Sequence, residues 1–167
     1  MRFSLDAAES YLDVEGRSSL HPVKAKGTNL RGYIDAQWND TQLVLDPAPR
    51  MHLEIPVESI SSGNGLEDRQ MRQLVGSRSF PNIVANLTQL SALDGKADTY
   101  AVTGAISLRG TTKNADGVIT LKRDGDRLVV DGEKSVDMRD FDIQPPRILM
   151  LQVYPELTIR MHLVGVP

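Results

Sequence analysis

The sequence contains no cysteine among its 167 residues. Disulfide bonds, thiolate nucleophiles, iron–sulfur clusters and cysteine-based zinc sites are therefore excluded. Aromatic residues make up only 5% of the chain and are scattered, which argues against a stacking platform for nucleic-acid bases. The 19 lysine and arginine residues are outnumbered by 22 aspartate and glutamate residues, and the net charge of −3 disfavours a nucleic-acid partner.

Long apolar runs are also missing. No stretch approaches the roughly 18 consecutive apolar residues of a membrane-spanning helix, so we expect no transmembrane segment. The first thirteen residues carry Asp6, Glu9 and Asp13 and lack the apolar region of a signal peptide. We expect a cytoplasmic protein as the sequence is given, or a periplasmic or secreted one if a leader was removed. Length and composition predict a single domain over residues 1–167.

Motifs for catalysis are scarce. The histidines His21, His52 and His162 are isolated, and we expect no metal site and no cofactor. A nucleophile elbow, a P-loop and a dinucleotide fingerprint are absent. Asp140 and Asp142 would share one face of a strand, so one alternative is a hydrolase-type enzyme in which this pair, with His162, does acid–base chemistry. Turn capping and solubility explain the same carboxylates, and we expect no catalytic residues.

What the sequence does contain is alternation of apolar and polar residues. It is clearest over residues 100–109, recurs at 30–38, 51–58 and 157–163, and is weaker at 12–14, 83–87, 119–121 and 128–130. Turn-forming clusters at 46–49, 94–95 and 123–126 separate these runs. About eight strands, each with one polar face, predict an all-β antiparallel sandwich or barrel.

One segment has a helical period instead. Asn64 is a good N-cap, with Glu67 in the capping-box position, and Gly76 is a natural stop. Apolar residues between 71 and 75 fall on one helix face. The pattern predicts a short helix near residues 65–75 that plugs one end of a barrel.

The inward phase of the strands includes several small residues, which would leave part of a barrel interior unfilled. An elongated apolar molecule would suit that space. The alternative is that large residues on the opposite wall interdigitate and close it. The small residues are Gly16, Gly32, Ala36, Ala85, Gly104 and Gly132.

Six segments, in this order, are similar to the sequence motifs of one known family: 8–14, 21–33, 53–68, 72–83 (through Arg72, Leu74, Phe80-Pro81 and Ile83), 104–113 and 138–143. Together they resemble the YceI-like family of lipocalin-like barrels, over nearly the whole chain from about residue 6 to residue 164. Three positions depart from the family pattern. Glu9 and Arg109 stand where the family has histidine, and Asp142 stands where it has glycine.

The resemblance implies an eight-stranded antiparallel lipocalin-like β-barrel. It also implies non-catalytic binding, for sequestration or transport, of a polyisoprenoid or another long-chain lipid in the interior. Arg109, Lys113 and Arg139 are candidates to meet a polar head group at the rim. The alternation assigns the lining of the cavity to Leu12, Val14, Leu30, Ile34, Trp38, Leu53, Ile55, Ile83, Leu87, Tyr100, Val102, Ile106, Leu108, Ile159 and Met161.

A second alternative is a filled barrel that acts only through protein partners. Its best surface is the apolar loop predicted at residues 141–156, which contains two adjacent prolines and the apolar run 148–151. A homodimer through residues 145–155 is one such arrangement, and a lid packed on the barrel is another.

Overall fold

The computed structural model describes residues 1–148 and 150–167. Its long strands are β7 (Arg50–Pro56), β8 (Asn82–Ala92), β9 (Thr99–Leu108), β10 (Thr111–Asp124), β11 (Arg127–Asp137) and β13 (Leu151–Val166). Near the N-terminus lie β1 (Arg2–Leu5), β2 (Tyr11–Ser18), β3 (Pro22–Gly27) and β4 (Arg31–Asp35). The remaining elements are the 11-residue helix α1 (Gly65–Val75), the two-residue strands β5 (Trp38–Asn39), β6 (Gln42–Leu43) and β12 (Arg147–Ile148), and the 3-10 turns η1 (Val57–Ser59) and η2 (Met138–Phe141).

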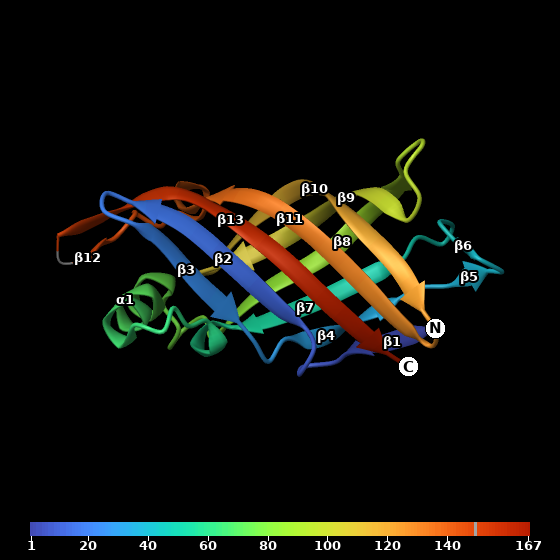
Figure 1. The fold of residues 1–167 in the computed structure, drawn as a ribbon, viewed down its shortest axis with the longest axis horizontal. Coiled ribbons are helices and arrows are strands. Elements are labelled where there is room, and N and C mark those ends of the chain that lie inside the picture. Colours follow the sequence, from blue (N-terminus) through green and yellow to red (C-terminus); the bar gives the residue numbers. More distant parts are fainter. Residues whose placement is uncertain (149) are drawn as a thin grey trace.

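The strands close into a ring, which confirms the predicted eight-stranded antiparallel barrel. The hydrogen-bonded order runs β1, β4, β7, β8, β9, β10, β11 and β13, and β13 pairs back onto β1. β2 and β3 extend β1 and β4 along the barrel, because β2 pairs with β13 and with β3. β1 and β2 thus form two halves of one interrupted strand. Figure 1 shows β13 crossing the whole length of the barrel.

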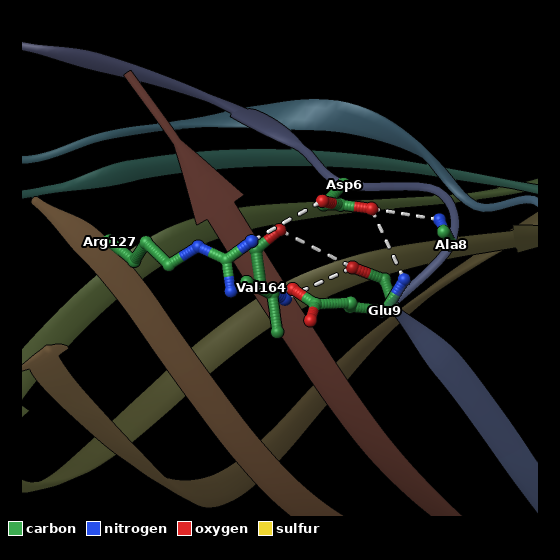
Figure 2. A network of polar contacts seen from close by, with 6 residues as sticks. Asp6, Ala8, Glu9, Arg127 and Val164 are labelled. Carbon is green, nitrogen blue, oxygen red and sulfur yellow. Dashed lines mark hydrogen bonds and ion pairs between the residues drawn. The ribbon is translucent and has the colours of Figure 1, made fainter.

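A polar junction holds the interruption between β1 and β2 against the last strand. The Asp6 carboxylate accepts hydrogen bonds from the amides of Ala8 (2.9 Å) and Glu9 (3.2 Å), and Arg127 pairs with Glu9 at 2.7 Å. Figure 2 shows Arg127 reaching from β11 toward both acidic residues. Beside them, the hydroxyl of buried Ser10 accepts from the amide of Val164 at 3.0 Å. Glu9 therefore belongs to the wall where the ring closes.

Helix α1 has the predicted bounds and covers one end of the barrel. The Asn64 side chain accepts from the amides of Leu66 and Glu67, and Gly76 ends the helix in the left-handed conformation with a φ of 68°. The capping box is not completed by Glu67, because the Asn64 amide donates instead to the Ser62 hydroxyl. An apolar plug of Val57, Val75, Phe141 and Ile143 joins α1 to η1 and η2.

The buried carboxylate of Asp68 fastens the helix to the segment before it. It accepts from the hydroxyls of Ser61 (2.9 Å) and Ser62 (2.7 Å) and from the Ser62 amide (2.8 Å). Ser61 in turn bridges to Lys26 of β3 through two backbone hydrogen bonds. Burial raises the pKa of Asp68, but these hydrogen bonds outweigh it and hold the pKa below the ordinary value of 3.8.

Three features of the sequence prediction need correction. β1 and β3 were not expected, because β1 has only four residues and β3 places the small residues Ala25 and Gly27 on its inward phase. The predicted strand 30–38 ends at Asp35, and Trp38 lies in the β5–β6 hairpin. The predicted loop 141–156 is replaced from residue 151 onward by β13, while position 149 lies outside the described residues.

We expect Ser10→Ala to destabilise the protein by about 1–3 kcal/mol, since it leaves the buried Val164 amide without its acceptor. Urea denaturation measures the change, with Ser135→Ala, at an exposed strand position, as the control. Equal midpoints for the two variants would show that the junction does not hold the ring closed.

We expect Asp68→Asn to destabilise the protein at neutral pH by about 1.5–3 kcal/mol, because hydrogen bonds to a charged carboxylate are lost. Since the folded pKa is depressed, the stabilisation from Asp68 is present above 3.8 and is lost as the pH falls through the lower folded value. Urea midpoints from pH 7 to pH 2 should therefore converge for parent and variant at the acid end. A gap that is unchanged at the lowest pH would contradict this assignment.

Candidate ligand site inside the barrel

The strand register shows which residues form the inner wall. Residues directly opposite each other in an antiparallel pair lie on the same face of the sheet. Gly104 pairs with Leu87 on one side and with Ala115 on the other, and Val102 pairs with Gly117. Across the ring, Val14 pairs with Ile159 and with Ala25. The predicted lining residues of these strands are all on the inward phase.

The inner wall is packed at one end of the barrel and accessible further along. On β10, β11 and β13 the inward residues Leu121, Leu128 and Leu163 are 0–3% exposed. Further along the same strands, Ala115 and Ile159 are half-buried although they lie on the inward phase. β9 shows the same change, from buried Tyr100 to half-buried Val102 and Ile106. These inward residues therefore keep part of their surface accessible.

The total surface area of the chain is larger than expected for its mass. The chain exposes 9729 Å², whereas a folded monomer of 18.4 kDa is expected to expose about 8,200 Å². An elongated shape and a partly accessible inner wall both add surface.

The predicted lining residues divide between these two zones. Those in the packed zone are Leu12, Leu30, Ile34, Leu53, Ile55 and Tyr100, each at most 9% exposed, with Trp38 set edge-on against Phe3. Those that remain half-buried are Val14, Ile83, Leu87, Val102, Ile106, Leu108, Ile159 and Met161.

The small inward residues occupy positions with different surroundings. A Cβ atom at Gly104 would lie 2.8 Å from the carbonyl oxygen of Asn86, beside the irregularity in β8, and one at Gly32 would lie 1.9 Å from that of His52. These glycines therefore admit a neighbouring backbone, and Ala36 belongs to the packed core. At Gly117 a Cβ atom would meet only the Cγ2 atom of Val102, at 3.9 Å. Gly117, which the sequence reasoning missed, is the small residue that leaves room.

The barrel wall loosens beside Gly117. The β10–β11 ladder ends at the pair Val118–Glu133. Beyond this pair, β10 remains paired only with β9, and β11 remains paired only with β13. Lys134 occupies the inward phase of β11 opposite Ile159, and its Nζ atom donates across the gap to the Asp116 carbonyl. Extending the alternation of Leu128 and Val130 along the chain would have found this half-buried inward lysine.

The three predicted rim residues lie at the end of the barrel that carries α1 and η2. Arg109 is in the β9–β10 turn and donates from Nη1 to the Asp142 carbonyl at 3.1 Å. Lys113 is opposite Ile106 on the inward phase and is exposed. Arg139 pairs with Asp137 at 2.6 Å, and this contact holds the pKa of the Asp137 carboxyl below its ordinary value.

The acid–base pair of the hydrolase alternative is not assembled. Asp140 lies in η2, and Asp142 follows it in the left-handed conformation with a φ of 58°, so the two do not share a strand face. His162 is bound elsewhere, with Nδ1 2.6 Å from Asp131 Oδ1. Within residues 1–148 and 150–167, no group of three or more histidine, aspartate or glutamate residues could hold a metal ion.

Two hollows lie outside this inner wall. One of about 800 Å³ runs along α1. The other, of about 440 Å³, lies over β8, β9 and β10 and is lined mainly by outward-facing residues such as Thr88, Thr103 and Asp116. In the described part of the chain, no helix is long and apolar enough to cross a membrane.

Comparisons with known proteins agree with this architecture. A scan against protein families matches the YceI-like domain to residues 3–165. A comparison with curated proteins found no match. Among solved structures, BcnA from Burkholderia cenocepacia is similar at a TM-score of 0.78 and 17% identity, covering 96% of this chain and 98% of that one.

Two further solved structures share the fold. A polyisoprenoid-binding domain from Saccharophagus degradans has a TM-score of 0.79 at 17% identity, covering 99% of this chain and 98% of its own. A Campylobacter jejuni YceI protein has a TM-score of 0.67 at 10% identity, covering 87% of this chain and 85% of its own.

Proposed function

Since the chain belongs to the YceI-like family, we propose that it binds a long-chain apolar ligand, a polyisoprenoid or another lipid, without catalysis and for sequestration or transport. The observation that carries the proposal is the inner wall, which is apolar, enclosed by a closed ring of strands and still accessible. The polyisoprenoid-binding domain with the same fold supports the choice of ligand class.

The chemistry of the wall suits a hydrocarbon chain. The half-buried inward residues Leu87, Val102, Ile106 and Ile159 offer contacts without hydrogen-bonding groups. Each buried CH₂ group contributes about 0.8 kcal/mol, so a long chain binds well without specific polar contacts. In the proposal, the inward lysines Lys113 and Lys134 meet a polar or anionic head group where β10 and β11 separate.

Lipid extraction followed by mass spectrometry of protein purified from its own source tests the proposal directly. A co-purifying long-chain species supports it. Protein that carries no such species and does not bind added farnesol, geranylgeraniol or solanesol would overturn it and favour a barrel that acts through partners. Among these three prenols, affinity should rise with chain length.

We expect Gly117→Leu to weaken prenol binding more than tenfold, because the new side chain enters the unfilled part of the interior. Folding should be unharmed or up to about 1 kcal/mol more stable, since glycine weakens a strand interior. Competition with a fluorescent polyene fatty acid measures binding, and urea denaturation measures stability. Asn114→Leu, which adds the same side chain on the outward face of β10, is the control.

A filled interior would give a different pattern. Overpacking would then make Gly117→Leu destabilising by about 1–3 kcal/mol. Prenol binding would be the same in Gly117→Leu and in the control Asn114→Leu. Ala115→Leu, one inward position along, repeats the test at an independent site.

A further inference from the structure

We propose that the α1 end of the barrel is a docking surface for an anionic lipid bilayer. The surface consists of an arginine-lined groove along α1 and of apolar side chains that project from the turns around it. This proposal concerns the outside of the barrel and is tested without measuring any ligand inside it.

The groove is the 800 Å³ hollow along α1. It is lined by Gly65, Arg69, Arg72, Gln73, Gly76, Ser77, Arg78 and Ser79, a set that contains three arginines and no carboxylate. The helical residues of this set recur at intervals of three and four and therefore share one helix face. Asp68 is turned away into its hydrogen bonds with Ser61 and Ser62, and Glu67 falls on the opposite side of the helix.

The arginines are held in different ways. Arg72 donates from Nη2 to the Glu58 carbonyl at 3.0 Å, and its buried Nε atom has no acceptor within the described residues. Arg69 and Arg78 are exposed. Arg72 thus fixes the groove to η1, while the two exposed guanidinium groups of Arg69 and Arg78 remain for phosphate oxygens, which guanidinium binds well.

Large apolar side chains are exposed around the same end. Leu20 in the β2–β3 turn is 70% exposed, and Met150 in the β12–β13 turn is 85% exposed. These two turns are tied together by hydrogen bonds between Ser19 and Gln152. Phe80, Leu66 and Tyr154 are also exposed. Figure 1 shows α1, β12 and the β2–β3 turn at one end of the long axis, opposite the β5–β6 hairpin.

Charge decides between the possible partners. The whole chain has a net charge of −3, so a patch of arginines without a carboxylate is a local departure from the rest of the surface. Basic residues among exposed leucine, phenylalanine, methionine and tyrosine fit a bilayer, where the apolar groups enter the interface and the cations meet anionic head groups.

Co-sedimentation with phosphatidylcholine vesicles that contain 30% or no phosphatidylglycerol tests the proposal. We expect binding to the anionic vesicles only, and weaker binding as salt rises. Arg69→Glu/Arg78→Glu should weaken it at least about 30-fold, because each basic residue near an anionic surface strengthens binding about fivefold. The matched control is Lys96→Glu/Lys122→Glu, which makes the same charge change at the opposite end of the barrel and should have a far smaller effect.

A second pair of variants tests the apolar contribution. Leu20→Ser should weaken vesicle binding, whereas Leu45→Ser, an exposed leucine near the β5–β6 hairpin, should not. No sedimentation with anionic vesicles, or equal loss in both charge variants, would overturn the proposal. A dimer that is seen by light scattering and is broken by Leu20→Ser would also overturn it, because the surface would then bind a second copy of the chain. Tighter binding to a polyglutamate peptide than to vesicles would overturn it as well, because it assigns the surface to a protein partner. Prenol binding that persists in Arg69→Glu/Arg78→Glu would show that the interior site is separate.

Discussion

The closure of the hydrogen-bonded ring is the constraint on which every other feature depends. β13 pairs with β11 along one edge and with both β1 and β2 along the other, so no long strand edge is left open there. Closure fixes which side of each strand faces inward, because side chains alternate along a strand. It also explains why the polar contacts of Ser10, Asp6 and Arg127 gather where the interrupted first strand meets β13.

A closed ring sets the diameter of the interior, and the side chains then determine how much of it is filled. Phe3, Leu128 and Leu163 fill one end almost completely. Beyond them, a Cβ atom at the inward Gly117 would meet only the Cγ2 atom of Val102, and the inward Ala115 is half-buried. The packed end supplies the cooperative core that a domain of this size needs. The accessible stretch can therefore stay partly unfilled without loss of the fold.

Many of the strands could be predicted from the sequence, because the alternation of apolar and polar residues is clear wherever the inward residues are large. Residues 100–108 and helix 65–75 were predicted closely for that reason, the helix through the caps Asn64 and Gly76. β3 was missed because its inward residues Ala25 and Gly27 are too small to give an alternating signal. A small inward residue does not by itself show that the space beside it is open. Composition cannot distinguish Gly104, whose side-chain position is occupied by a backbone carbonyl, from Gly117, whose position is open.

The same limit applies to the charged residues. Arg109, Lys113 and Arg139 all lie at the α1 end, and their role toward a head group stays a prediction. The contacts of Arg109 with the Asp142 carbonyl and of Arg139 with Asp137 join residues from different turns or from a turn and a strand end, so sequence alternation does not predict them. Lys134 is a charged residue whose position the alternation does predict. A lysine on the inward phase of a barrel strand is costly unless its ammonium group finds an acceptor, and the separation of β10 from β11 exposes the Asp116 carbonyl that it needs. The interruption of the wall and the inward lysine therefore explain each other, and both mark this side of the barrel as the place where a polar group can approach an otherwise apolar interior.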